Sequence, residues 1–347
     1  MACSSRVLII GGYGHVGLKI GMILRREGAI AVRLAGRDRL RAEAAASKIG
    51  GEACRVDLAD ATTWAPALAE VDLVVLCTDA PDTSFASFVA SRGLAFIDIT
   101  ADDAAFKSME ALDGEAVRSG ARMVLSVGLA PGLTNLLVRA CADRLDVPET
   151  ATIGVLLGLG DSHGAAAVNW MIDAVKRSSR LGLKTRRLMT PWSARPWPFV
   201  SFPFADQFVV CRTLGLGQAR TFLTFDSAIL SRVVFSLCRR FGRHDAFGSI
   251  VRSVVERFRV GSNRAALIVT VAGRRAGREA RMEASLEGRD ESGITAMVAA
   301  AVGRRLLTGS GVAGVRHIEQ MITIDDLAAE LRSLGVILRL PEAPLLR

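Results

Sequence analysis

Several residue types that carry chemistry are scarce in this chain of 347 residues. It contains one tyrosine, four histidines and six cysteines. The histidines and cysteines are scattered, without H-E-x-x-H or C-x-x-C spacing, so we predict neither a metal site nor a disulfide framework. The only tyrosine is Tyr13, and the residue four positions later is Gly17 rather than lysine, which excludes the tyrosine–lysine catalysis of short-chain dehydrogenases. The G-x-S-x-G motif of serine hydrolases is also missing.

Long hydrophobic runs are equally scarce. No window offers the ~18 uninterrupted apolar residues of a membrane span, and the N-terminal residues lack the charged and apolar regions of a signal peptide. We therefore predict a cytoplasmic protein without a membrane span. Basic residues exceed acidic ones by 44 to 35, but they are spread along the chain without interleaved aromatics. This pattern favours solvated surface arginines over nucleic-acid binding, and an anionic cofactor or substrate fits the charge equally well.

A glycine-rich turn near the N-terminus is the most informative stretch. An apolar, strand-like run at 7–10 leads directly into G-G-Y-G-H-V-G, and a helical pattern follows at 15–27. In a dinucleotide-binding turn the first glycine allows the sharp turn, the second lets backbone N–H groups approach a pyrophosphate, and the third lets the helix pack closely. The helix N-terminus faces the phosphates. We expect the cofactor to contact Gly12, Tyr13, Gly14, His15, Val16 and Gly17.

Strands and helices alternate over the first part of the chain. Strands are predicted at 7–10, 30–34, 54–57, 73–77, 95–99 and 123–127, and helices between them at 15–27, 39–48, 64–68, 83–91 and 103–118. The next helix is expected at 131–145, with Pro131 in its first turn. This alternation predicts an α/β fold with a doubly wound parallel sheet, the Rossmann type.

The ends of three strands bear on the cofactor. Arg37 is the first polar side chain after the second strand, where NAD-binding domains usually place an acid, and its guanidinium is able to pair with a 2′-phosphate. Asp38 follows one position late and suits a helix N-cap. We therefore predict NADP rather than NAD. Asp57 either faces the adenine or caps the next helix, and Thr78 is expected to contact the cofactor at the carboxyl end of the fourth strand.

The alternation stops near residue 150. Strands are predicted at 153–159, 208–213, 266–272 and 278–286, and helices at 163–181, 229–240 and 247–258. This part of the chain is typical of an α+β domain with a mixed sheet and helices on one face, and such sheets often dimerise through the exposed face. Helices at 294–307 and 325–334 and a strand at 336–340 are expected to return to the first domain. The predicted boundaries are 1–130 for the dinucleotide-binding domain, 131–293 for the substrate and dimerisation domain, and 294–347 for the return.

The motifs together resemble those of the saccharopine dehydrogenase-like oxidoreductases of the saccharopine reductase type. The resemblance rests on G-G-Y-G-H-V-G, the arginine after the second strand, V-D-L after the third, G-L-A-P-G-L-T-N, and G-I-T-A-M-V-A-A-A-V-G-R-R-L-L-T-G near the end. It implies a split Rossmann domain with an inserted α+β domain, a homodimer, and NAD(P)-dependent reduction of a C=N bond, or the reverse, on an amino-acid-derived substrate. Lysine-pathway members carry aspartate directly before Pro-Gly; here that residue is Ala130, which puts saccharopine itself in doubt.

Candidate residues for catalysis and substrate binding lie in the second part of the chain and in the P-G-L-T-N turn. His163 is the candidate proton donor because an imidazole titrates near neutral pH, and a structural, hydrogen-bonded role is the alternative. Residues expected to line the substrate site are Ala130, Asn135, Trp170 and Trp197. The aromatic segment at 192–204 fits either an apolar lid or an interface.

The sequence therefore predicts an NADP-dependent biosynthetic reductase of an imine or iminium bond in a small molecule. Two other functions stay open. One is reduction of a C=C or C=O bond in a more hydrophobic substrate, and the other is a non-catalytic NADP-binding protein.

Overall fold

The computed structural model describes residues 5–26, 28–158, 160, 184–241, 261–309, 311–341 and 345–346. The chain divides into two compact units, the first formed by Met1–Gly132 and Ser292–Met321 and the second by Leu133–Glu291 and Ile322–Arg347. The predicted helices at 163–181 and 247–258 lie outside the described residues. No helix in the described part of the chain is long and apolar enough to cross a membrane.

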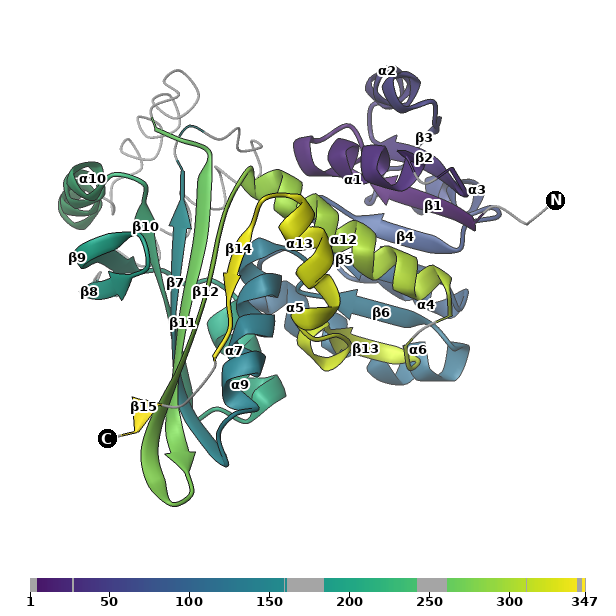
Figure 1. The fold of residues 1–347 in the computed structure, drawn as a ribbon. Coiled ribbons are helices and arrows are strands. Elements are labelled where there is room, and N and C mark those ends of the chain that lie inside the picture. Colours follow the sequence, from purple (N-terminus) through teal and green to yellow (C-terminus); the bar gives the residue numbers. More distant parts are fainter. Residues whose placement is uncertain are drawn as a thin grey trace. The chain divides into compact units, whose positions relative to one another are not determined.

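The first unit is built on a parallel sheet of seven strands in the order β13-β6-β5-β4-β1-β2-β3 (Figure 1). The strand order reverses beside β1, which pairs with β2 on one side and β4 on the other. Its central strands are apolar because helices bury both faces of such a sheet. The strands are β1 Ser5–Ile10, β2 Ile30–Gly36, β3 Glu52–Arg55, β4 Leu73–Leu76, β5 Ala95–Asp98, β6 Arg122–Leu125 and β13 Gly314–His317.

Helices connect these strands. The helices are α1 His15–Arg26, α2 Arg39–Ile49, α3 Trp64–Ala67, α4 Ser84–Ser91, α5 Asp103–Glu110, α6 Asp113–Ser119 and α12 Glu291–Leu307. The Lys19 ammonium donates to Ser292 Oγ (2.8 Å), which places α1 beside α12. Gly303 brings α12 close to the sheet, because a Cβ there would lie 3.0 Å from a methyl group of Leu73. The predicted alanine-rich helix thus covers the sheet of the first unit.

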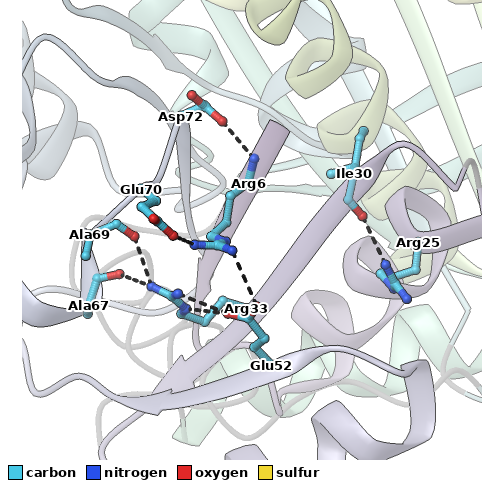
Figure 2. A network of polar contacts seen from close by, with 9 residues as sticks. All are labelled: Arg6, Arg25, Ile30, Arg33, Glu52, Ala67, Ala69, Glu70 and Asp72. Atoms are coloured by element: carbon cyan, nitrogen blue, oxygen red, sulfur yellow. Dashed lines mark hydrogen bonds and ion pairs between the residues drawn. The ribbon is translucent and has the colours of Figure 1, made fainter. Parts of the chain in front are cut away.

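Arginines tie the amino-terminal edge of this sheet together (Figure 2). Arg33 on β2 donates to the Glu52 carboxylate (2.9 and 3.1 Å) and to the carbonyl of Ala67 (3.0 Å). On β1, the Arg6 guanidinium pairs with Glu70 and its backbone N–H donates to Asp72 Oδ2 (2.7 Å). These cations are engaged in structural contacts at the edge opposite the glycine turn.

The second unit is built on a mixed sheet of eight strands, with the path β14-β12-β11-β7-β10-β9-β8 and β15 paired to β12 (Figure 1). Its strands are β7 Val147–Leu157, β8 Thr185–Thr190, β9 Ser193–Ser201, β10 Gln218–Phe225, β11 Arg264–Arg275, β12 Arg278–Arg289, β14 Ile337–Arg339 and β15 Leu345–Leu346. Its helices are α7 Thr134–Ala142, α9 Asp206–Leu214, α10 Ala228–Phe241 and α13 Ala328–Ser333.

The two faces of this second sheet differ in polarity. Along β11, Leu267, Val269 and Val271 are buried on the face that α7 covers, whereas Thr270 and Ala272 point to the other face. The same alternation occurs at 150–153 in β7, 218–221 in β10 and 280–284 in β12, as expected where one face is packed and the other is exposed. We call the second side the open face.

The predicted fold class is confirmed, since a doubly wound parallel sheet is combined with a second, mixed sheet. Three local predictions were wrong. The strand expected at 208–213 is part of helix α9, the helix expected at 103–118 is interrupted between α5 and α6, and α7 begins at Thr134 rather than at Pro131. The C-terminal return also differs: from Ile322 onward the chain belongs to the second unit, where β14 pairs with β12.

Candidate functional site

The glycine turn leaves β1 at the carboxyl edge of the parallel sheet, beside the position where the strand order reverses. Gly11 has φ +76°, a left-handed conformation that glycine adopts without strain. The N–H groups of Gly11 and Gly12 both donate to the carbonyl of Ala35 (2.8 and 3.0 Å), which ties the turn to β2. Open α/β sheets bind ligands at this place.

The space around each glycine shows whether the turn fits a phosphate group. A Cβ on Gly12 would lie 2.8 Å from the Ile9 carbonyl oxygen, and one on Gly17 would lie 2.6 Å from the Gly11 carbonyl oxygen. A Cβ on Gly14 would approach only the Gly11 oxygen, at 3.0 Å, and Gly14 is exposed. Two glycines therefore close the turn against the strand, and the third leaves its outer side open, as pyrophosphate binding requires.

Helix α1 begins directly after this turn. His15 and Val16 are its first two residues, and its first turn carries no acidic side chain. Arg25 and Arg26 lie in its last turn, where cations complement the helix dipole. The N-terminal end of α1 thus combines a partial positive charge with an open approach over Gly14.

Tyr13 connects the glycine turn to the end of β2. Its ring covers Gly36, because a Cβ on Gly36 would lie 2.4 Å from Tyr13 Cε1. The Arg41 guanidinium lies over the same ring, 4.6 Å from its centre. Arg37, directly after Gly36, is exposed and makes no hydrogen bond or ion pair with any residue that the structure describes. Two arginines and a tyrosine therefore surround the end of β2: Arg37 directly after it, Arg41 from α2 and Tyr13 from the glycine turn.

The two acids near this end have local roles. The Asp38 carboxylate caps α2 by accepting from the Arg41 N–H (3.0 Å). The Asp57 carboxylate accepts from the Ala59 N–H (3.1 Å) and lies 3.5 Å from Arg55 Nη2. Asp60, rather than Asp57, caps the short helix that follows. The Val56 N–H donates to the Gly36 carbonyl (3.0 Å). Asp57 therefore lies beside the end of β2, directly after which Arg37 follows.

The carboxyl ends of β4 and β5 complete this edge of the sheet. A Cβ on Gly11 would lie 3.3 Å from Thr78 Cβ, so Thr78 adjoins the glycine turn. Asp98 ends β5, where both carboxylate oxygens accept from Thr100, through its N–H (2.8 Å) and its hydroxyl (2.9 Å). Burial raises the pKa of Asp98 to about 6, and burial also raises the pKa of Asp79 beside it.

Sequence reasoning missed a buried hydrogen-bonded chain at the same edge. Ser126 follows β6 with φ +59°, and its hydroxyl lies 2.7 Å from His317 Nδ1 at the end of β13. His317 Nε2 lies 2.9 Å from Glu110 Oε1. Ser126 and His317 are 0% and 3% exposed, so this chain positions the segment after β6 rather than supplying an accessible nucleophile. No strand was predicted at 314–317, so no sequence pattern pointed to His317 at this edge.

The residues predicted to bind substrate are placed differently. Ala130 is half-buried and extended, and Leu129 before it donates its N–H to Thr295 Oγ1 (3.3 Å). Asn135 is fully buried in α7 and accepts from the Thr134 hydroxyl (3.3 Å). His163 and Trp170 lie outside the described residues.

The aromatic segment at 192–204 is part of the second sheet, not a lid. Trp197 lies on β9, and its indole Nε1 is 3.1 Å from Thr224 Oγ1 and 3.2 Å from the Phe225 carbonyl oxygen. Phe199 and Phe202 are buried. The indole N–H of Trp197 is thereby engaged within the second unit.

Comparison with known proteins extends the description of the fold. The chain matches no protein-family model and no curated protein sequence. Among solved structures, apo saccharopine dehydrogenase (L-Glu forming) from Saccharomyces cerevisiae has a TM-score of 0.69 at 14% identity, over 96% of this chain and 99% of that one. The DAP dehydrogenase of C. glutamicum in complex with DAP has a TM-score of 0.50 at 16% identity, over 94% and 98%.

An engineered D-amino acid dehydrogenase bound to NADP+ gives the same TM-score of 0.50 at 17% identity, over 94% of this chain and 99% of that one. At these identities the likeness establishes a shared fold. The resemblance to saccharopine dehydrogenase-like proteins that the motifs predict is confirmed at that level.

Proposed function

We propose that this chain is an NADP-dependent oxidoreductase that transfers hydride between the nicotinamide ring and a carbon bonded to nitrogen in an amino-acid-derived substrate. The observation that carries the proposal is the end of β2. There, next to an open glycine turn, two arginines and a tyrosine replace the acid that would accept hydrogen bonds from an NAD ribose.

The charges at this end favour a 2′-phosphate. Arg37 is exposed and unpaired within the described residues, and Arg41 is held over the Tyr13 ring. The carboxylate of Asp38 caps α2 through Oδ1, so helix capping accounts for the acid at this position. A phosphate between two guanidinium groups forms charge-assisted hydrogen bonds, which are about twice as strong as neutral ones.

The remaining residues of the edge have separate tasks in this proposal. The Gly12–Gly17 turn and the first N–H groups of α1 hold the pyrophosphate. Thr78, beside the turn, contacts the cofactor where the carboxyl end of β4 meets it. The bound cofactor supplies the hydride chemistry, and the chain binds and orients it. Reduction of a C=N bond also needs a proton, for which His163 remains the candidate.

The substrate class is inferred from the proteins that share this fold. Saccharopine dehydrogenase, DAP dehydrogenase and D-amino acid dehydrogenase are all named for amino-acid substrates. Ala130 offers no carboxylate or hydrogen-bonding side chain at its position, so we expect a substrate other than saccharopine. The homodimer and the cytoplasmic location belong to the same proposal.

A fluorescence titration with NADPH and with NADH tests the cofactor assignment. The chain is expected to bind NADPH more tightly, and Arg37→Ala is expected to weaken NADPH binding about tenfold or more because a charge-assisted contact is lost. NADH binding should change little in the same variant. Arg39→Ala is the matched control, because Arg39 is exposed two residues further along, at the start of α2, but pairs with Glu43 (2.8 Å). Equal affinity for both nucleotides, or an equal effect of Arg37→Ala on both, would contradict the proposal.

A further inference from the structure

The open face of the second sheet carries a cavity of about 730 Å³. Its floor is formed by β7, β10, β11 and β12, and β8 forms a wall. Ligand sites for small molecules usually have volumes of about 300–1,000 Å³. Every described residue that lines the cavity belongs to the second unit.

Strand register brings arginines to this cavity from several elements. Arg220 on β10 lies opposite Thr152 on β7, and Arg281 on β12 lies opposite Ala272 on β11. Arg339 on β14 lies opposite Ser285, at the other end of the cavity floor. Residues that face the same side of neighbouring strands are direct neighbours, so these side chains share one surface.

The wall strand β8 adds two more cations. Arg186 and Arg187 both line the cavity. Arg186 reaches the floor, where its Nη1 lies 3.3 Å from Thr152 Oγ1 and its guanidinium lies 5.7 Å from the centre of the Phe222 ring. This contact brings a second guanidinium to the threonine that Arg220 faces.

The charge of the cavity is not balanced by its own residues. Among the residues that the structure describes, five arginines line it together with a single acidic residue, Glu283. Of the five, only Arg186 has a hydrogen bond among the described residues, and that partner is neutral. Other arginines of the same unit are paired: Arg264 with Glu287 (2.6 Å) and Arg274 with Glu149 (3.4 Å).

One hydroxyl in the wall is also unpaired. Thr190 is 7% exposed, and its Oγ1 has no hydrogen-bond partner among the residues that the structure describes. Buried polar groups normally have a partner, because an unpaired one loses its hydration without compensation. Thr190 is one of the residues that line the cavity, together with the five arginines.

We propose that the cavity on the open face binds a small molecule with at least two anionic oxyacid groups, phosphate or carboxylate. The arginines supply charge-assisted hydrogen bonds, and the Thr152 hydroxyl supplies a neutral one. A second copy of the chain docked on this face would bury these arginines from both copies, whereas a small anion neutralises them in place. The proposal therefore assigns this face to the anion and not to the homodimer contact.

Isothermal titration of the full chain with tripolyphosphate and with citrate tests this site and distinguishes phosphate from carboxylate. Saturable binding of at least one probe is expected, and Arg220→Ala combined with Arg281→Ala should weaken it about tenfold or more. The Arg220→Lys and Arg281→Lys pair, which keeps the charge, should bind with intermediate affinity. Arg275→Ala combined with Arg278→Ala is the matched control, since both residues are exposed on the same hairpin and lie outside the cavity.

Three results would overturn the proposal. The first is that neither probe binds saturably. The second is that the control pair weakens binding as much as the cavity pair, which would indicate attraction by overall charge alone. The third is a concentration-dependent dimer in sedimentation that dissociates when Arg220→Glu is combined with Arg281→Glu, and that neither probe disrupts. This result would assign the open face to a second copy of the chain.

Discussion

Replacing Gly17 with alanine should damage both the first unit and its cofactor site. The added Cβ would lie 2.6 Å from the Gly11 carbonyl oxygen and 3.0 Å from Gly12 Cα. Both contacts are backbone atoms of a turn tied to β2, so they cannot move away as a flexible side chain would. Overpacking of this kind costs about 1–3 kcal/mol, and the higher helix propensity of alanine offsets up to about 1 kcal/mol of it.

Gly14→Ala is the matched comparison. Its Cβ would meet only the Gly11 oxygen, at 3.0 Å, on the exposed side of the turn. We therefore expect a change in unfolding free energy below about 1 kcal/mol. The methyl group would nevertheless stand where the backbone has to approach the pyrophosphate, so NADPH binding should weaken about tenfold or more.

Thermal unfolding and NADPH titration of both variants separate the two effects. Gly17→Ala should lower the melting temperature of the first unit by about 2–8 °C and weaken NADPH binding as well. Gly14→Ala should leave the melting temperature nearly unchanged and weaken only the binding. If Gly14→Ala bound NADPH as tightly as the unchanged chain, the outer side of the turn would not be the phosphate site.

Three further substitutions test individual contacts. Burial raises the pKa of Asp98 to about 6, so ionisation of this carboxyl should lower the free energy of unfolding by up to about 3 kcal/mol as pH rises from about 4 to above 6. Asp98→Asn should remove this pH-dependent loss when unfolding is measured against pH. Trp197→Phe leaves Thr224 Oγ1 and the Phe225 carbonyl without the indole donor, and chemical denaturation should show a loss of about 1–2 kcal/mol. His317→Phe removes a buried hydrogen bond to Ser126 and a part-buried one to Glu110 and should lower the melting temperature, whereas an unchanged value would show that the chain to Ser126 contributes nothing.

The first unit was predictable because its local signals agree with one another. Apolar strands, capped helices and the glycine turn all point to one doubly wound sheet. Asp38 illustrates this agreement. Its position before a helical pattern predicts an N-cap, and in the structure its carboxylate accepts a hydrogen bond from the Arg41 N–H. Arg37 likewise follows β2 at the turn, as the spacing predicts.

The second unit was less predictable because tertiary contacts override local preference. The run at 208–213 is rich in β-branched and aromatic residues, yet it belongs to α9, where Val209 and Val210 are buried and Asp206 accepts from Thr221 (2.6 Å). Strand preference is weak compared with such burial. The cavity arginines come from four strands far apart in the sequence, and only the register of the sheet brings them together.

The Pro131 prediction failed for a conformational reason. Proline suits the first turn of a helix, but Ala130, Pro131 and Gly132 are all non-helical, and Gly132 has φ +136°. A Cβ on Gly132 would lie 2.9 Å from the Ser126 carbonyl oxygen, so the chain folds back tightly on the end of β6 before α7 begins. Sequence spacing alone gave no indication of this close approach.

Transfer of deuterium from NADPH labelled at nicotinamide C4 tests the central claim most directly. The full chain would be incubated with labelled NADPH and imines formed from 2-oxo acids and amines, with NADPH oxidation followed by absorbance and the products analysed by mass spectrometry and NMR. The account predicts oxidation of NADPH and deuterium on the carbon bonded to nitrogen in the product. Tight binding of NADPH without its oxidation by any imine, or deuterium on a carbon bonded to oxygen instead, would contradict it.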